Sequence, residues 1–350
     1  MKKLQSTPDF HGLPRLQKLT IEGCYELEEI HPSFGSHTSL EYLKVSYCTK
    51  LRMFPTIVHM RNLKTLKING CNLKDGEIPS GIGELSNLKE LDLSDNDFSL
   101  LDISISQLTC LKVLKLSLCD NLIELPDLPS RLVILNASYC KSLTTIGNFH
   151  RNCKWLSHVS LNETTIQNDG ERLLQSMLEG NAIENGSMLF LFPGLEIPMG
   201  FTPPLLRGSR YTFQLPENWR DDFSGFLICA VSNYILISTD ILKISVKQVS
   251  SDVSYEDDVV WEESDGDRIT VVWYVSFGLL RNVAWLVQTY KALSFELAEY
   301  ECSGFGVTLV AKKNRSGLTE TSTINSYDYT RVIKIEHDKA SDAIMISSSV

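Results

Sequence analysis

The sequence lacks the short motifs by which the common enzyme families bind nucleotides, activate a nucleophile or hold a catalytic metal. Its 350 residues contain no G-x-x-x-x-G-K-[ST] or G-x-G-x-x-G phosphate loop, no G-x-S-x-G turn and no H-E-x-x-H pair. The seven histidines are scattered, and no two of the nine cysteines have the C-x-x-C spacing of a zinc site. These absences predict a protein that is not an enzyme and that needs no cofactor or metal.

The sequence also lacks an apolar run of the roughly 18 residues needed to cross a bilayer. Its first residues, M-K-K-L-Q-S, are basic, but the apolar segment of a signal peptide does not follow them. We therefore expect no membrane span and a place in the cytoplasm, with the nucleus as the alternative. Basic residues number 33 against 43 acidic ones, which argues against a nucleic-acid partner because phosphate binding needs a basic field.

What the sequence does contain is a repeat in its first half. The pattern L-x-x-L-x-(L/I/V)-x-x-(C/N), with Ala137 as an exception at the third apolar position, starts at Leu16, Leu40, Leu63, Leu88, Leu111 and Leu132. Its last position is Cys24, Cys48, Cys71, Asn96, Cys119 or Cys140. The third apolar positions follow one another after 24, 23, 25, 23 and 21 residues, the period of a leucine-rich repeat. Leu156, Val159 and Leu161 fit a degenerate terminal copy.

This spacing has a physical meaning. The L-x-L core is a short strand whose alternate side chains point inward, and one coil cannot bury its own leucines whereas stacked coils can. We therefore predict an α/β leucine-rich-repeat solenoid of six or seven coils with a parallel sheet on its concave side. The five cysteines at the last position are expected to be packed thiols in a reducing compartment, with side chains that face inward and bond the backbone of neighbouring turns.

Because the leucines and cysteines build the core, function must lie in the outward residues between them. These side chains line the concave sheet, and the predicted partner-binding set is Tyr42, Lys44, Lys67, Glu90, Asp92, Lys115 and Asn136. Three lysines in one column suit an acidic or polar protein partner. The alternative is that these residues are polar only because exposed strand faces are polar.

The second half of the chain has a different pattern of apolar and polar residues. Residues 169–180 predict a helix with an apolar stripe, and a polar linker follows it. Short β-branched and aromatic runs then predict an all-β sandwich, with strands at 188–192, 210–214, 225–231, 242–249, 268–274, 293–299 and 306–311. The predicted domains are the repeats at 1–165, a helix and linker at 166–187, the sandwich at 188–312, and a partly disordered extension at 313–350 with one candidate strand at 331–335.

One segment inside the predicted sandwich is strongly acidic. Residues 252–267 contain eight acidic residues and no basic one. Asp265 and Asp267 flank Gly266, but the segment does not match a complete calcium-binding EF-hand loop. A solvated acidic loop is the favoured interpretation, and the sequence does not assign it a role.

Two groups of motifs carry a family resemblance. The first is Thr7-Pro8-Asp9-Phe10 with Ile30-His31-Pro32-Ser33 in the early repeats, and the second is the Pro-Gly-x-Glu-Ile-Pro stretch at 193–198 with the late strand at 301–310. Together they resemble plant intracellular immune receptors that combine a Toll/interleukin-1-receptor-like (TIR) domain, a nucleotide-binding (NB-ARC) domain, leucine-rich repeats and a jelly-roll/immunoglobulin-like post-repeat domain, the C-JID. Residues 199–201 and 276–291 depart from the family pattern.

The resemblance implies that the repeats and the post-repeat domain together contact a pathogen effector or a guarded host protein. The chain would then be the sensing half of a receptor, as a fragment, a truncated gene product or a complete protein. Any NADase activity would belong to a TIR domain, which this chain lacks along with the nucleotide-binding domain. In a full-length receptor both of those domains would be partners of this region.

Two other functions fit the same sequence. The repeats could form a regulatory scaffold that holds a partner or a sister domain inactive, without any foreign ligand. Alternatively, the sandwich could bind carbohydrate through exposed aromatic side chains, for which Trp261, Trp273 and Trp285 are the candidates.

Overall fold

The structure is a computed structural model of the chain. It describes residues 4–52, 54–146, 153, 155–166, 173–174, 177–178, 187–193, 206–208, 210–232, 243–249, 269–280, 292–297, 302–312, 333–338 and 343–348. The chain divides into two compact units, Met1–Gly180 and Asn181–Val350, and each is described by itself. No helix among the described residues is long and apolar enough to cross a membrane.

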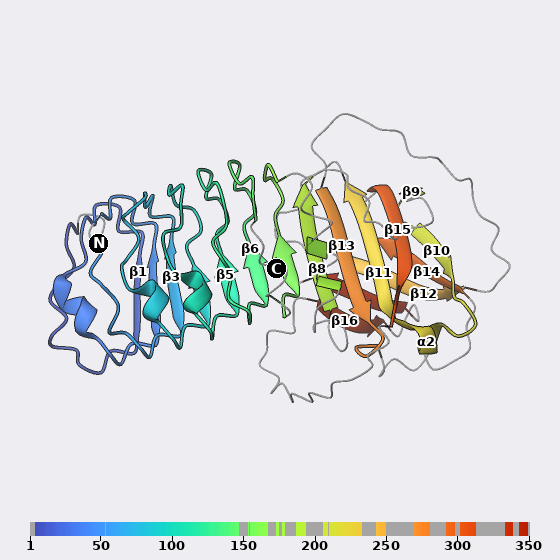
Figure 1. Ribbon diagram of the computed structural model, residues 1–350, viewed down its shortest axis with the longest axis horizontal. Helices are drawn as coiled ribbons and strands as arrows, with labels where there is room; N and C mark the ends of the chain where they lie inside the picture. The colour runs from blue at the N-terminus through green and yellow to red at the C-terminus, as the bar shows by residue number, and fades with distance from the viewer. Residues whose placement is uncertain are drawn as a thin grey trace. The chain divides into compact units, whose positions relative to one another are not determined.

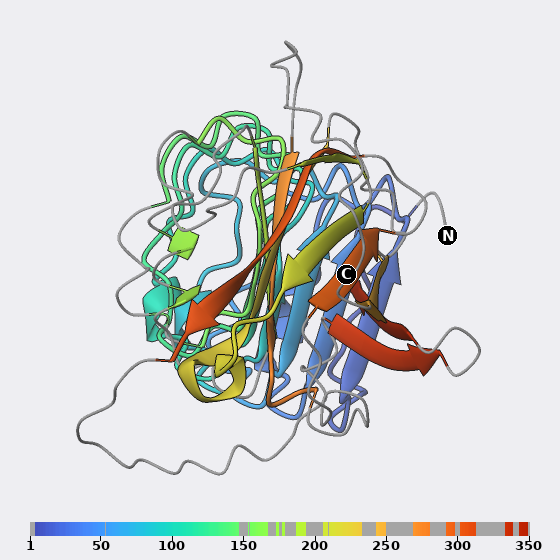
Figure 2. The same ribbon diagram turned by 90° about the vertical axis from the view of Figure 1, so that its right-hand side faces the viewer.

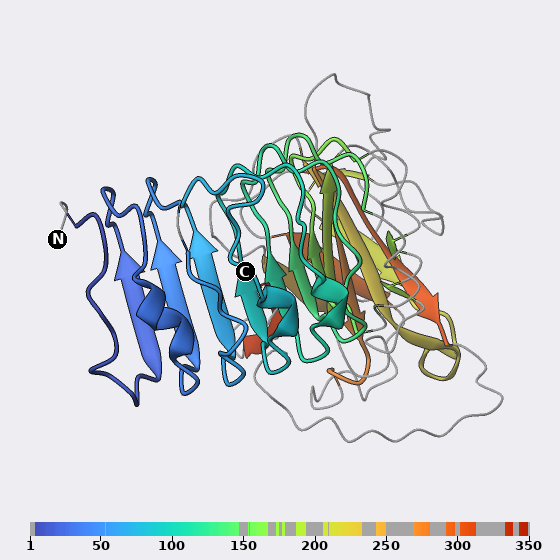
Figure 3. The ribbon, with the colours of Figure 1, turned by 60° about the vertical axis from the view of Figure 1, so that its left-hand side comes forward.

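The first unit is a solenoid with a ladder of parallel strands (Figures 1 and 3). Each strand pairs in register with the strand of the next coil, so that Leu19, Leu43 and Leu66 are neighbours, as are Leu91, Leu114, Leu135 and Val159. This confirms the predicted parallel sheet and the strand of the degenerate terminal coil. The strands are β1 (Lys18–Glu22), β2 (Tyr42–Ser46), β3 (Thr65–Asn69), β4 (Glu90–Asp92), β5 (Val113–Lys115), β6 (Ile134–Asn136) and β7 (His158–Ser160).

In the described residues, the returning half of each coil contains at most a short helical turn. Three 3-10 turns are present among the described residues, η1 (Pro32–Ser36), η2 (Ile82–Glu84) and η3 (Ile105–Gln107). Coils of 21 to 25 residues leave little chain for a long helix after the strand and its turn are formed. Figure 3 shows these turns beside the parallel strands.

The solenoid core is built from the repeated leucines and the residue at the end of each pattern. From Leu40 to Leu135 every leucine of the repeat pattern is fully buried, and so are Cys48, Cys71, Cys119 and Cys140. Asn96 shows what this last position does, because its Oδ1 accepts from Leu73 N (3.0 Å) and its Nδ2 donates to the carbonyls of Ile68 and Leu93 (both 2.8 Å). The expected inward, backbone-bonding role of this position is therefore confirmed.

The residue just before that position has a left-handed backbone in every coil. The φ angles are +66° at Gly23, +55° at Tyr47, +64° at Gly70, +58° at Asp95, +61° at Leu118, +62° at Tyr139 and +55° at Glu163. The first six backbone N–H groups of this set each donate to a carbonyl of the next coil, at 2.7 to 3.0 Å. This column is called the left-handed edge below. It ends the sheet and turns the chain into the core.

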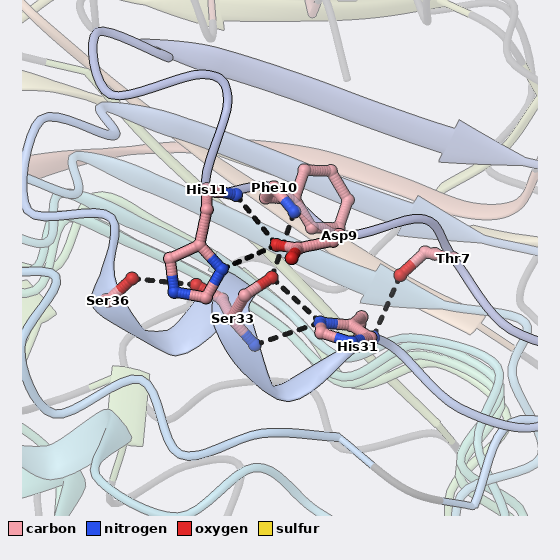
Figure 4. A network of polar contacts seen from close by, with 7 residues as sticks. All are labelled: Thr7, Asp9, Phe10, His11, His31, Ser33 and Ser36. Carbon is pink, nitrogen blue, oxygen red and sulfur yellow. Dashed lines mark hydrogen bonds and ion pairs between the residues drawn. The ribbon is translucent and has the colours of Figure 1, made fainter.

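The first coils are tied together by a polar network (Figure 4). Phe10 N donates to Ser33 Oγ (2.9 Å), His31 N donates to Thr7 Oγ1 (2.8 Å), and Asp9 Oδ1 accepts from His11 N (2.8 Å). Hydrogen bonds from His11 and Ser33 lower the pKa of Asp9 to about 2. The network thus joins the two motifs that carry the family resemblance in the repeats.

This network contains a serine, a histidine and an aspartate, but it is not arranged for nucleophilic catalysis. His31 Nδ1 already accepts from the backbone N of Ser33, the Ser33 side chain is buried, and Asp9 pairs with His11 rather than with His31. A nucleophile needs an accessible hydroxyl and a base that a third group orients. We therefore assign the network a structural role.

The second unit contains two antiparallel sheets. One sheet has the strand order β8 (Ser187–Pro193), β13 (Ile269–Ser276), β11 (Phe223–Ser232), β15 (Cys302–Ala311) and β9 (Leu206–Gly208). The other has the order β10 (Arg210–Gln214), β14 (Ala292–Leu297), β12 (Lys243–Val249), β17 (Ala343–Ser348) and β16 (Ile333–Asp338). Side chains of both sheets, including Phe226, Trp273, Phe295 and Phe305, form one hydrophobic core.

Several expectations for this half need correction. The segment from residue 313 was predicted to be an extension with one candidate strand at 331–335. The strand β16 overlaps that candidate, but β17 was not predicted, and it pairs with β12 some hundred residues earlier in the chain. The single-turn helix α2 (Trp219–Asp222, yellow in Figure 2) and the short strand β9 were not predicted. Such short elements depend on distant pairing and leave little periodicity in the sequence.

Trp273 does not support carbohydrate binding, because it is 1% exposed and belongs to the core. Its strand, β13, is buried on both faces, so that periodicity alone could not separate inward from outward residues. Trp261, Trp285 and the acidic segment 252–267 lie outside the described residues. Within the predicted helix 169–180, the described residues 173–174 and 177–178 are helical.

Candidate protein-binding surface

The predicted partner-binding residues lie on neighbouring parallel strands. Lys44 is directly beside Lys67, Lys67 beside Asp92, Asp92 beside Lys115, and Lys115 beside Asn136. Tyr42 and Glu90 occupy the flanking column, on either side of Thr65. All seven side chains are partly exposed. The structure therefore brings the whole set together in one array, with adjacent coils about 4.8 Å apart.

The first part of this array is largely neutralised by pairing between coils. Lys44 Nζ is 3.0 Å from Glu22 Oε1, and Lys67 Nζ is 2.7 Å from Glu90 Oε1. Burial alone would lower the pKa of Lys67, but Glu90 and Asp92 outweigh it and raise that pKa above its usual value. Lys18 Nζ lies 4.6 Å from the centre of the Tyr42 ring. Two of the three predicted lysines are therefore engaged within the chain.

Lys115 differs from the other two lysines, because it has no ion pair among the described residues. Two further cations belong to the same two coils, Lys112 immediately before β5 and Arg131 shortly before β6, and neither has an ion pair in the described part of the chain. Burial, and then the charges of Arg131 and Lys89, lower the pKa of Lys112. These unpaired cations form the electropositive part of the surface.

The sequence did not single out Lys112 or Arg131, because both lie outside the L-x-L strand core. The period of the repeat does, however, place the residue after the first leucine of each copy in one column, which holds Lys64, Lys89 and Lys112. Lys64 is paired with Glu41 (2.7 Å), whereas Lys112 has no ion pair among the described residues. The column of Lys64, Lys89 and Lys112 was therefore the feature of the sequence that could have indicated Lys112.

The columns on either side of the central outward residues contain several buried side chains. Ser46, Val113 and Ser138 lie in columns that flank the central outward residues of the strands, yet they are buried. Ser46 Oγ donates to Asn69 Oδ1 (2.7 Å), and Ser138 shares a hydrogen-bond cluster with Ser160 and Asn162. Small hydroxyl side chains that form hydrogen bonds between coils become buried within the array. The alternation of inward and outward residues along a strand does not predict this burial.

The last coil also buries a histidine. His158 is 3% exposed, its Nδ1 has no hydrogen-bond partner among the described residues, and burial together with the charge of Lys115 lowers its pKa to about 4. The imidazole is therefore neutral at physiological pH. Among the described residues no three His, Cys, Asp or Glu side chains gather into a metal site.

Comparison with known proteins gives two matching domain types. The C-JID domain matches residues 192–347, and the Leucine Rich Repeat matches residues 62–85 and 87–108. The first match extends beyond the predicted sandwich boundary at residue 312 and includes β16 and all but the last residue of β17.

Similar curated proteins are plant resistance proteins. The TMV resistance protein N of Nicotiana glutinosa is 29% identical over an alignment of 273 positions, gaps included, that covers 65% of this chain and 23% of that protein. The disease resistance protein RPS4 of Arabidopsis thaliana is 30% identical over an alignment of 257 positions that covers 67% of this chain and 20% of that protein. The chain spans less than a quarter of the length of these relatives.

Among solved structures, an internalin from Listeria monocytogenes covers 43% of this chain and 59% of its own chain, with 18% sequence identity and a TM-score of 0.27. A likeness at that score carries no argument about shape or function.

Proposed function

The chain is homologous to the leucine-rich-repeat and C-terminal region of TIR-type plant disease resistance proteins, and on that premise we propose that it senses a pathogen effector or a guarded host protein. The partner binds the concave sheet of the repeats, the C-JID domain completes the contact, and the complex forms in the cytoplasm. The regions matched in the relatives are repeats and C-JID, not an enzymatic domain. We accordingly assign the chain recognition and no catalysis.

The observation that supports this proposal most is the array around Lys115. The core accounts for the leucines and cysteines, and the ion pairs account for Lys44 and Lys67, but Lys112, Lys115 and Arg131 have no such role in the described structure. Like charges close together destabilise the free protein unless an anionic partner joins them. The proposed partner therefore presents an acidic patch to coils five and six.

For the second unit we propose a β-sandwich of the jelly-roll/immunoglobulin-like type. Two antiparallel sheets contribute side chains to one core, as expected for sheets that pack face to face. Loops at the ends of such a domain are suited to protein contacts, because a rigid scaffold positions them. In a longer receptor, the occupied sensor would then act on nucleotide-binding and TIR domains.

The test is an interaction screen of a pathogen effector library against the whole chain, followed by quantitative binding of each hit. A matched pair of variants locates the contact. Lys112→Gln/Lys115→Gln removes two unpaired cations of the array, whereas Lys50→Gln/Lys141→Gln removes two cations that are paired with Glu26 and Asp120. We expect the first variant to weaken capture at least about tenfold and the second to leave it within about twofold.

Equal capture by both folded variants would refute the contact with coils five and six. A screen that yields only host regulators of signalling, and no effector or effector-modified host protein, would instead support the regulatory-scaffold function. Circular dichroism and thermal unfolding of both variants show that a loss of binding is not a loss of fold.

A further inference from the structure

The left-handed edge places bulky side chains where glycine would serve the fold better. A left-handed backbone costs a non-glycine residue roughly 1–2 kcal/mol, and glycine avoids that cost. Coils one and three use glycine, at Gly23 and Gly70, and show that the turn needs no side chain. Coils two, five and six nevertheless carry Tyr47, Leu118 and Tyr139.

These side chains are not explained by burial. Tyr47 is 47% exposed and Leu118 is 51% exposed, which makes them two of the large apolar residues that the described structure leaves in contact with solvent. Tyr139 is partly exposed. Part of the Tyr47 ring packs over Gly70 of the next coil, but large, half-exposed side chains on a strained backbone are better explained by contact with another molecule.

Carboxylates accompany the rings along the same edge. A Cβ atom placed on Gly70 would lie 2.6 Å from Tyr47 Cδ1 and 3.1 Å from Asp95 Oδ2, so the ring and the carboxylate are neighbours over Gly70. Glu163 is close enough to Tyr139 that its charge, after burial, raises the pKa of that phenol. The edge thus holds two pairs of a tyrosine and a carboxylate.

The left-handed edge contains no basic side chain that could form an ion pair with these carboxylates. None of its seven residues is Lys or Arg, and Asp95 has no ion pair among the described residues. The lysines that follow the same turns, Lys50 and Lys141, are already bound to Glu26 (2.6 Å) and Asp120 (2.9 Å). The edge is therefore acidic and aromatic, in contrast to the cations around Lys115.

We propose that the left-handed edge binds an extended, arginine-rich segment of a partner protein. A guanidinium group stacks on a tyrosine face while its N–H groups donate to a neighbouring carboxylate, a combination that a lysine ammonium matches less well. Leu118 contacts the aliphatic stem of an arginine. The inference goes beyond the proposed function, because it concerns the left-handed edge rather than the array around Lys115. Its partner is basic, whereas the proposed effector contact is acidic.

The geometry of the edge sets the length of the segment. Seven coils at about 4.8 Å span about 29 Å, which an extended chain at about 3.4 Å per residue covers with about nine residues. Alternate side chains of an extended peptide point the same way, so arginines at every second position would face the edge.

The probe is a fluorescein-labelled nine-residue peptide of alternating arginine and glycine, and its counterpart has citrulline in place of arginine. Citrulline keeps the planar shape and loses the charge. We expect the full chain to bind the arginine peptide at least about tenfold more tightly than the citrulline peptide, by fluorescence anisotropy at physiological salt. Comparable affinity for both peptides, or no binding of either, would overturn the proposal.

Glycine substitutions then test the edge without harming the fold. Tyr47→Gly/Leu118→Gly/Tyr139→Gly removes the side chains while supplying the residue that suits the backbone. We expect it to unfold no more easily than the wild type and to bind the arginine peptide at least about tenfold less tightly. Full retention of peptide binding by this variant would show that only the net charge of −10 attracts the peptide, and would refute the proposal.

A pair of charge-matched variants separates the edge from general electrostatics. Asp95→Asn removes the carboxylate beside the Tyr47 ring, and Asp102→Asn removes an exposed carboxylate shortly before η3 in the same coil. We expect only the first to weaken peptide binding, and equal effects would refute the site. Lys112→Gln/Lys115→Gln leaves peptide binding intact, so failure here and failure of the proposed effector contact are distinguishable.

Discussion

The Tyr47 ring lies against the backbone of Gly70, one coil further along the solenoid, so closely that a Cβ atom on Gly70 would be 2.6 Å from Tyr47 Cδ1. Tyrosine in coil two and glycine in coil three are therefore coupled. The glycine has two functions at once, since it supplies the left-handed φ of +64° and leaves room for the ring.

Gly70→Ala is therefore expected to lower the free energy of unfolding by about 2–4 kcal/mol, from the left-handed backbone and from displacement of the ring. Gly23→Ala is the matched control, because it has a similar φ of +66° and its nearest neighbour, Tyr25 Oη, is 4.0 Å from the added atom. That variant should lose only the backbone contribution, about 1–2 kcal/mol. Urea unfolding of both measures the difference, and equal losses would show that the ring yields freely.

The position of Asn96 in the ladder allows a second prediction. Asn96→Ala leaves Leu73 N–H and two carbonyls without their partner in a fully packed core, and should cost about 2–4 kcal/mol. Asn96→Cys should cost less, because five other coils use cysteine there and Cys140 Sγ bonds the Leu116 carbonyl at 3.0 Å. Thermal unfolding of both variants gives the order. A cysteine variant no more stable than the alanine variant would contradict it.

Much of the solenoid could be predicted because each coil repeats the same local requirement. Leu43, Leu66 and Leu91 recur at one offset, and strand alternation alone gives the faces. The left-handed edge could not be predicted, since only Gly23 and Gly70 carry the usual sign of a positive φ while Tyr47 and Leu118 conceal it.

The sequence also could not predict which lysines of the array form ion pairs. Lys44, Lys67 and Lys115 look equivalent in a column, but Glu22 and Glu90 pair with the first two from neighbouring coils or columns. Which acid reaches which lysine depends on side-chain paths across the sheet rather than on spacing. The strand β17 was missed for a similar reason, since its pairing with β12 is remote in sequence.

Thiol accessibility provides a third prediction. Of the eight cysteines whose side chains are described, seven are buried and Cys110 is partly exposed. Burial raises the pKa of Cys153 to about 12, whereas a hydrogen bond with Cys71 lowers the pKa of Cys48. Because Cys48 is buried but has a lowered pKa, it tests whether the reactivity of a thiol depends on access of the reagent or on ionisation of the thiol.

We expect iodoacetamide to modify Cys110 well before Cys48 in the native protein, because a thiolate without contact to the reagent does not react. Peptide mapping by mass spectrometry after short labelling times gives the order, and labelling in urea serves as the control in which all sites react. Native labelling of Cys48 at the rate of Cys110 would mean that the coils around it open readily.

The buried imidazole of His158 makes stability depend on pH. Burial, and then the charge of Lys115, lower its pKa from 6.5 to about 4 in the folded state. As the pH falls from about 6.5 towards 4, the unfolded chain binds a proton that the folded chain does not, so stability is lost across this window. At pH 5 the loss is about 2 kcal/mol, and little more is lost below pH 4 because the folded state then takes up the proton as well.

His158→Gln removes this linkage, so the variant should lose about 2 kcal/mol less stability than the wild type between pH 7 and pH 5, whatever its stability at neutral pH. His59→Gln removes an exposed imidazole and should keep the wild-type dependence. Urea unfolding at a series of pH values compares all three. The same pH dependence in His158→Gln as in the wild type would mean that water or a conformational opening solvates His158, and that the last coil is less tightly closed than its buried serines and asparagine indicate.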